Sequence, residues 1–123
     1  MQIVQDGSVV AEYDIDLGQN PIGKKQFKGD GKTPEGEYYI SGKNPNSSYY
    51  MSMQISYPNP MDIANARSHK RHPGGSIMIH GLAGNVHSYG KDWTRGCVGM
   101  RNNLDMLAVY KMVRVGTKVI IYR

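Results

Sequence analysis

Alternation of apolar and polar residues predicts that much of this chain forms short β-strands. The first two candidate strands cover residues 2–5 and 8–17, and they flank Asp6-Gly7, a dipeptide favoured in two-residue hairpin turns. The later half of the second segment alternates regularly, which is typical of a half-buried strand. Further strands are predicted at residues 37–41, 51–57, 76–80, 98–100 and 117–122.

One segment near the C-terminus has the spacing of an amphipathic helix. The apolar residues on its predicted inner face are Met106, Val109, Tyr110 and Val113. Asn102 or Asn103 can cap its start, and Gly116 is placed to follow its end. A shorter helix is expected over residues 61–66. With about six strands, the chain is predicted to be a mainly β domain with one main helix packed on it.

A glycine-rich connection links the first strands to the rest of the chain, over residues 18–36. Within it, Gly31-Lys32-Thr33 copies the end of a phosphate-binding loop. The first glycine of that motif would fall on Gln26, however, and Pro34 stands where the helix should begin. We therefore interpret this segment as a series of turns.

Length and composition limit the classes of protein to consider. With 123 residues the chain is expected to form one domain, residues 1–123, that buries a core without metals or disulfides. A formal net charge of +5 suggests an anionic partner. The pattern of aromatic and basic residues in RNA-recognition motifs is missing, so nucleic acid is not expected. Neither a signal peptide nor a span of ~18 apolar residues is recognisable.

Cys97 is the only cysteine of the chain, and its neighbours favour a reactive thiol over a structural one. Gly96 and Gly99 flank it at a predicted junction of loop and strand. Glycine lets a ligand approach the backbone, and successive N–H groups there can bind an oxyanion. The thiolate is the nucleophilic form, so the thiol pKa of about 8.5 must be lowered by a neighbouring imidazole or cation.

His80 is the candidate for that imidazole. It ends the apolar segment 76–80 and is followed by Gly81, so it is expected where a buried strand opens into a loop. A histidine in such a place is often only structural. Its presence 17 positions before the single cysteine favours a catalytic role instead.

These residues lie in motifs that resemble the YkuD-type L,D-transpeptidases. His-Gly at residues 80–81 and Thr-Arg-Gly-Cys at residues 94–97 are similar to the family's His-Gly and Ser/Thr-x-Gly-Cys elements. Residues 29–36 are similar to its Gly-Asp-x-x-Thr-Pro-x-Gly stretch, and residues 115–119 to its ending. The likeness therefore runs from about residue 15 to residue 122.

The resemblance implies a β-sandwich or barrel-like domain that acts on the peptide stems of bacterial peptidoglycan, in the periplasm or cell envelope. In that family Cys97 would attack the carbonyl before the terminal D-Ala of a tetrapeptide, and His80 would take and return the proton. An amine that resolves the thioester gives transfer, whereas water gives an L,D-carboxypeptidase. The sequence leaves both open, with transfer preferred, and the family requires no metal or organic cofactor.

The resemblance also implies roles for neighbouring residues. It implies that the oxyanion is bound, or His80 is oriented, by Gly81, Gly96 and Val98. Substrate contacts would come from Thr94, Arg95, Gly99, Tyr89 and Gly90. Two of these depart from the family, because Arg95 stands where many members have His and Gly99 where many have Arg.

Two other functions remain as alternatives. A module that binds peptidoglycan without chemistry would need neither Cys97 nor His80. A zinc hydrolase could use His80, His87 and Cys97, or His69 and His72, but none of the usual zinc-binding spacings is present.

Overall fold

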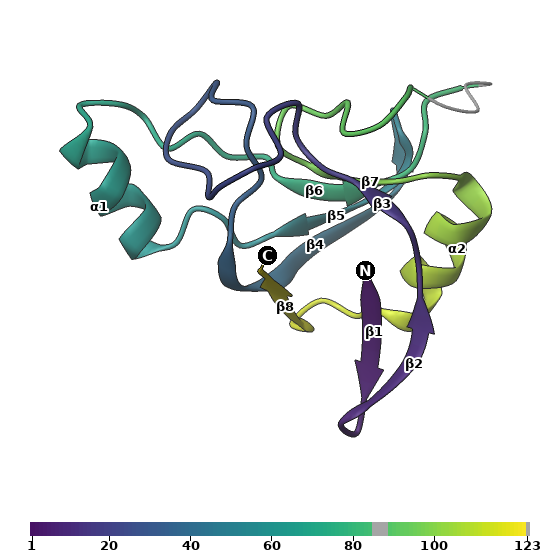
Figure 1. Cartoon of the computed structure of the whole chain (residues 1–123). Helices are drawn as coiled ribbons and strands as arrows, with labels where there is room; N and C mark the ends of the chain where they lie inside the picture. Colours follow the sequence, from purple (N-terminus) through teal and green to yellow (C-terminus); the bar gives the residue numbers. More distant parts are fainter. Residues whose placement is uncertain (85–88, 123) are drawn as a thin grey trace.

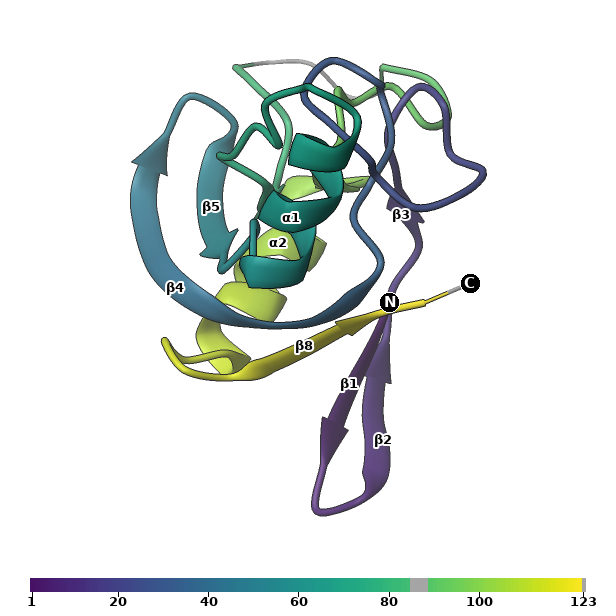
Figure 2. The ribbon, with the colours of Figure 1, turned by 90° about the vertical axis from the view of Figure 1, so that its left-hand side faces the viewer.

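A six-stranded sheet that curls on itself forms the body of the molecule, and a separate two-stranded hairpin extends from it (Figures 1 and 2). The computed structural model describes residues 1–84 and 89–122. The elements along the chain are β1 (Gln2–Gln5), β2 (Ser8–Glu12), β3 (Ile15–Asp16), β4 (Gly36–Ser47), β5 (Tyr50–Ile55), α1 (Pro60–Ser68), β6 (Met78–His80), β7 (Val98–Met100), α2 (Asn103–Met112) and β8 (Lys118–Ile121). The large sheet has the order β3-β7-β6-β5-β4-β8, so the mainly β prediction is confirmed.

One hydrophobic core lies between the sheet and α2, which packs against β5 and β7. Strand alternation supplies it: in β4, Tyr38 and Ile40 are buried while Tyr39 points to solvent. The buried core residues are Tyr38, Ile40, Met53, Ile55, Tyr57, Ile77, Ile79, Val98, Met100, Met106, Val109 and Val113. Full burial of each aliphatic side chain stabilises the fold by ~1.5–3 kcal/mol.

The N-terminal hairpin forms around Asp6-Gly7, but its second strand is shorter than predicted. Both turn residues have positive φ angles, 52° and 79°, as a tight hairpin turn requires. The expected strand over residues 8–17 ends at Glu12. Ile15 and Asp16 form β3, which pairs antiparallel with β7 in the large sheet. The chain therefore moves from one sheet to the other within a segment of continuous alternation.

β4 continues six residues beyond the predicted end at Ser41. It pairs with β5 as far as Ser47, whereas β8 pairs only with the residues from Gly36 to Tyr39. The far half of β4 therefore has an unpaired edge, where the missing N–H of Pro45 costs no ladder hydrogen bond. The long curved strand is prominent in Figure 2.

Both helices have capped ends. Asn102 caps α2 by accepting the N–H of Asp105 at 2.8 Å. Lys43 reaches from β4 to the other end of α2, where its Nζ donates to Tyr110 O and Val113 O at 2.6 and 2.7 Å. The short helix expected over residues 61–66 is present as the nine-residue helix α1, and with α2 it makes two helices in the described part of the chain, as predicted. No helix in the described part of the chain is long and apolar enough to cross a membrane.

The glycine-rich connection folds back over the sheet beside the segment that precedes β7. Gly18 forms an isolated parallel bridge with Thr94, and its N–H donates to Thr33 Oγ1 at 3.0 Å. A Cβ at Gly18 would overlap Gly31 O and lie 3.3 Å from Gly96 Cα. Glycine is therefore required where three segments distant in sequence meet.

We expect Gly18→Ala to destabilise the protein by about 1–3 kcal/mol, because the methyl group overpacks a site closed by backbone atoms. Gly42→Ala is the matched control, since a Cβ there has no neighbour within 4 Å. Urea unfolding of both variants measures the difference. Equal midpoints for the two variants would contradict the close approach at Gly18.

Candidate active site

The parallel pairing of β6 with β7 brings the two predicted catalytic residues to one face of the sheet. Ile79 pairs with Val98 and His80 with Gly99, and this register sets Met78 beside Cys97. Since side chains alternate between faces, Cys97 and His80 emerge on the face opposite the core. Strand geometry places their Cα atoms about 8 Å apart, a separation that the two side chains can bridge.

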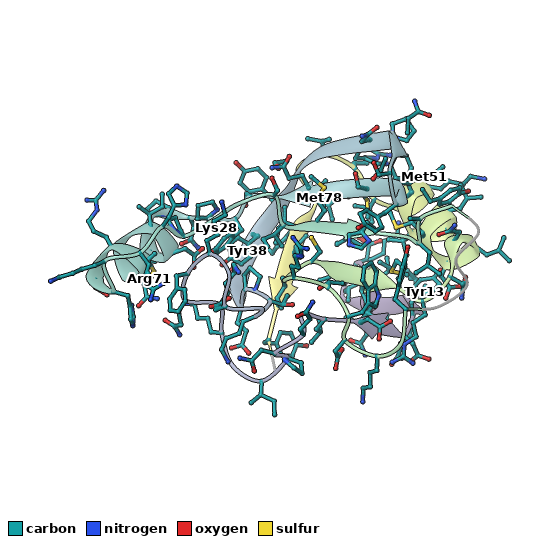
Figure 3. All side chains as sticks on the ribbon, turned by 90° about the horizontal axis from the view of Figure 1, so that it is seen from above. Tyr13, Lys28, Tyr38, Met51, Arg71 and Met78 are labelled. Carbon is teal, nitrogen blue, oxygen red and sulfur yellow. The ribbon has the colours of Figure 1, made fainter. Side chains whose placement is uncertain are left out.

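Cys97 lies half-buried immediately before β7. Its Sγ accepts the N–H of Met78 at 3.4 Å, and its S–H can donate to Ser76 O at 3.5 Å. Met78 is labelled near the middle of the molecule in Figure 3. Burial raises the pKa of the Cys97 thiol, while the Met78 N–H and the charge of Lys25 act in the opposite direction. The resting residue is therefore a neutral thiol at neutral pH.

His80 is buried at the end of β6 and held in one tautomer. Its Nδ1 lies 2.8 Å from Gly81 O, and because a carbonyl can only accept, Nδ1 carries the hydrogen and Nε2 keeps its lone pair. Burial lowers the pKa of His80, although the bond to Gly81 O opposes this shift. The imidazole is therefore neutral and suited to accept a proton at Nε2.

Aromatic rings cover His80 and account for its burial. Its ring centroid lies 4.7 Å from that of Tyr49 and 5.5 Å from that of Trp93. Tyr89 stacks on the other side of Trp93 at 4.2 Å. Tyr49 was not predicted as part of the site, because the register of β5 against β6 brings it there from a distant loop.

The departure from the family at Gly99 has a steric reason. A Cβ at Gly99 would lie 3.3 Å from Trp93 Nε1 and 3.4 Å from Thr94 Cγ2. The indole therefore occupies the space that a side chain at this position would need. Trp93 Nε1 itself is buried without a hydrogen-bond partner among the described residues.

A hydrogen-bonded turn holds Cys97 at the start of β7. Thr94 Oγ1 donates to Cys97 O at 2.6 Å and accepts the N–H of Gly96 at 3.2 Å. Gly96 has a φ of 142°, and a Cβ there would lie 2.8 Å from Lys32 O. Thr94 is buried by these contacts, so it shapes the turn from within.

Backbone N–H groups suited to an oxyanion can be identified by elimination. The N–H of Gly96 is bonded to Thr94, and the N–H of Gly81 donates to Tyr49 O at 3.0 Å. The predicted donor Val98 belongs to β7. Among the turn and loop hydrogen bonds of residues 1–84 and 89–122, none is donated by the Cys97 N–H, so this group is a candidate donor to an oxyanion beside the thiol.

Lys25 is a charged residue of the site that was not predicted from the sequence. Its Nζ donates to Asp30 Oδ1 at 3.0 Å, and the two side chains are only 4% and 6% exposed. A Cβ at Gly96 would lie 3.6 Å from Lys25 Nζ, so the ammonium group packs against the turn that carries Cys97. Its positive charge lowers the pKa of the thiol.

Asp30 anchors this lysine through the surrounding loop. It accepts the N–H groups of Gln26, Phe27 and Lys32 at 2.7, 3.2 and 3.1 Å. Burial alone would raise the pKa of Asp30, but these bonds and the one from Lys25 hold it below its usual value. Asp30 belongs to the Gly-Asp-x-x-Thr-Pro motif, so the sequence did contain a signal for the carboxylate. That motif does not identify its partner Lys25, five residues earlier.

Asn103 fixes the chain that leaves β6. Its Oδ1 accepts the N–H of Leu82 at 2.8 Å, and its Nδ2 donates to Leu82 O at 3.4 Å. The first residue of α2 thereby holds Gly81, whose carbonyl orients His80. The sequence predicted Asn102 or Asn103 as the cap of this helix. Asn102 is the cap, and the contact of Asn103 with Leu82 was not predicted.

The remaining predicted site residues lie at the rim. Arg95, Tyr89 and Gly90 are exposed, and Arg95 is two residues before the nucleophile. His87 of the zinc alternative falls outside the described residues. Among residues 1–84 and 89–122, no group of three or more His, Cys, Asp or Glu side chains could hold a metal ion.

Solved structures with this fold are known from several bacteria. The helical cell shape determining protein Pgp2 from Campylobacter jejuni is 27% identical, over 94% of this chain and 40% of that one, with a TM-score of 0.71. Bd1075 from Bdellovibrio bacteriovorus is 27% identical, over 94% and 39% of the two chains, with a TM-score of 0.58. An L,D-transpeptidase from Mycobacterium smegmatis shares the fold at 18% identity, over 96% and 51%, with a TM-score of 0.59.

The chain thus spans well under half the length of the first two of these proteins. No curated protein sequence is significantly similar to it. Residues 1–121 match the family model of the L,D-transpeptidase catalytic domain, YkuD. Because this match covers nearly the whole chain and the fold agrees with it, the chain belongs to the YkuD family of L,D-transpeptidase catalytic domains.

Proposed function

We propose that this domain is a cysteine-dependent L,D-transpeptidase that acts on tetrapeptide stems of peptidoglycan in the cell envelope. The observation that carries the proposal is the pairing of β6 with β7, which sets Cys97 and a neutral His80 on one face of the sheet. His80 keeps the Nε2 lone pair that a general base needs. A module that only binds would not need this combination.

The proposed reaction begins when His80 Nε2 takes the thiol proton as Cys97 Sγ attacks the carbonyl carbon before the terminal D-Ala. The C=O π electrons move to the oxygen, which the Cys97 N–H stabilises. When the oxyanion collapses, the C–N bond breaks and the imidazolium gives its proton to the departing amine of D-Ala. The acyl group remains on Sγ as a thioester.

The charges of the resting site determine when the thiolate forms. Both partners start neutral, because burial raises the pKa of Cys97 and lowers that of His80. An ion pair therefore develops only during attack. Lys25, held by Asp30, opposes the cost of placing a negative charge on buried sulfur.

The thioester is resolved by an acceptor amine, which attacks the same carbonyl carbon while His80 Nε2 takes its proton. The C–S bond then breaks, the imidazolium returns the proton to Cys97 Sγ, and the acyl group leaves on the amine nitrogen. The rings of Tyr49 and Tyr89, which lie against His80 and Trp93, are partly exposed, so an acceptor can contact them. Water at the same position would make the enzyme an L,D-carboxypeptidase. Similarity to a protein named for determining helical cell shape supports a role in cell shape.

Incubation with a disaccharide-tetrapeptide tests the proposal directly. We expect mass spectrometry to detect a covalent adduct on Cys97 and, with an added D-amino acid, exchange of the terminal D-Ala. Cys97→Ala should abolish both, and Cys97→Ser should lose turnover because a hydroxyl is far less acidic than a thiol. Turnover by the alanine variant would refute the covalent mechanism, and tripeptide as the only product would identify a carboxypeptidase.

The pH dependence tests His80 as the base. Since burial places its pKa below the usual 6.5, His80 stays neutral and kcat/KM should persist until pH falls through that lowered value. His80→Ala should remove turnover and slow alkylation of Cys97 by iodoacetamide near neutral pH by at least ~10²-fold. His69→Ala, which removes an exposed histidine at the C-terminal end of α1, is the control. An unchanged alkylation profile in His80→Ala would exclude this residue as the partner of the thiol.

The role of Lys25 is tested by the pKa of Cys97. Lys25→Met should raise this pKa further, because the cation that favours the thiolate is lost. Lys28→Met removes an exposed cation from the same loop and should leave it unchanged. The rate of iodoacetamide alkylation against pH gives both values.

Asp30→Asn separates charge from loop structure. It breaks the same ion pair as Lys25→Met and retains the lysine. If both variants raise the pKa of Cys97 equally, the pair acts only by holding the loop. Thermal melting of each variant checks that the fold persists, since breaking a buried ion pair costs about 3–5 kcal/mol.

A further inference from the structure

A groove of about 550 Å³ lies where α1 ends and the chain turns back toward β6. Its lining includes the apolar residues Pro58, Ile63 and Pro73. The remaining lining residues are Arg67, Lys70, Arg71, His72 and Gly74. The groove therefore combines cationic and apolar side chains, and no acidic side chain of the described residues is part of its lining.

The three full charges of this groove lack carboxylate partners. Among the described residues, the cations in salt bridges are Lys25, Arg101 and Lys118. Arg67, Lys70 and Arg71 are all exposed and none joins such a pair. Like charges gathered in one concavity repel one another and raise the local concentration of anions.

The groove is held in shape by contacts from three directions. The N–H of Lys28 donates to His72 O at 2.8 Å, and Tyr57 OH donates to Pro73 O at 2.7 Å. The Arg71 guanidinium lies over the Phe27 ring, 5.0 Å from its centroid. These bonds order the basic loop before a ligand arrives, so binding costs little conformational entropy.

The groove lies next to the nucleophile along the chain. Gly74 lines it, and Ser76, whose carbonyl oxygen is 3.5 Å from Cys97 Sγ, is only two residues further. Two residues span at most about 7 Å. In Figure 3, Arg71 lies at the α1 end of the molecule, Lys28 lies nearer the middle, and Met78 lies beyond Lys28.

We propose that this groove binds the carboxylates of the peptidoglycan stem peptide whose carbonyl Cys97 attacks. The proposal rests on the proposed function and names a substrate subsite for it. Arg67 and Arg71 offer guanidinium groups that bind carboxylates bidentately, and Lys70 adds a point charge. The apolar residues of the lining can contact the short alkyl chains that separate the carboxylates of such a peptide.

Binding to Cys97→Ala, which cannot turn over, tests the subsite. Isothermal titration calorimetry with the disaccharide-tetrapeptide compares this protein with one that also carries Arg67→Gln and Lys70→Gln. Among the described residues, neither side chain takes part in a hydrogen bond or salt bridge, and Gln preserves helix propensity at position 67 in the last turn of α1. Lys111→Gln with Arg114→Gln, at the far end of α2, removes the same charge from exposed positions.

We expect the groove variant to bind the tetrapeptide about tenfold more weakly, which corresponds to ~1.4 kcal/mol. The α2 variant should bind within about twofold of the parent protein, a difference below ~0.5 kcal/mol. A tetrapeptide with amidated carboxyl groups should bind all three proteins equally. Equal weakening by both charge changes, or the same loss for the amidated peptide, would overturn the subsite.

The same titrations separate this proposal from the function on which it rests. If the parent protein binds no stem peptide at all, the proposed substrate is wrong and the subsite fails with it. If the parent protein binds the peptide and the groove variant binds it equally well, only the subsite is wrong. Titration with inorganic phosphate measures how strongly the groove attracts an anion that is not a peptide. Phosphate that binds as tightly as the tetrapeptide and competes with it would also overturn the assignment to carboxylates.

Discussion

The parallel pairing of β6 with β7 is the contact on which the rest of the candidate site depends. A slip of one residue in its register would turn either Cys97 or His80 toward the core. A parallel pair also needs a long crossover connection, and here that connection carries Trp93 and the Thr94 turn. The strand register thus determines both the positions of the reactive groups and what covers them.

Burial and charge act against each other at this site. Burial keeps the imidazole and the thiol neutral. Lys25 places a positive charge near the sulfur, and the carboxylate of Asp30 balances that buried charge. The loop amides around Asp30 make this possible, because they stabilise the carboxylate that holds the lysine. The glycine-rich connection therefore contributes electrostatics as well as shape.

Local pattern predicted the elements that carry Cys97 and His80, the Asn102 cap and the mainly β fold. It did not predict Lys25 or Tyr49, whose places depend on pairing between distant segments. The end of β4 was also missed, because Pro45 and its polar neighbours have the composition of a loop. Such a segment becomes a strand only because β5 pairs with it while its other edge needs no hydrogen bonds.

The protonated state of Cys97 has a consequence for the durability of the protein. Oxidation to sulfenic acid and beyond proceeds through the thiolate, so susceptibility follows thiolate character and exposure. Burial of Cys97 raises its pKa and keeps the thiolate scarce. With a single cysteine in the chain, no internal thiol is available to trap a sulfenic acid as a disulfide. The environment that keeps the thiol protonated thereby also slows its irreversible oxidation.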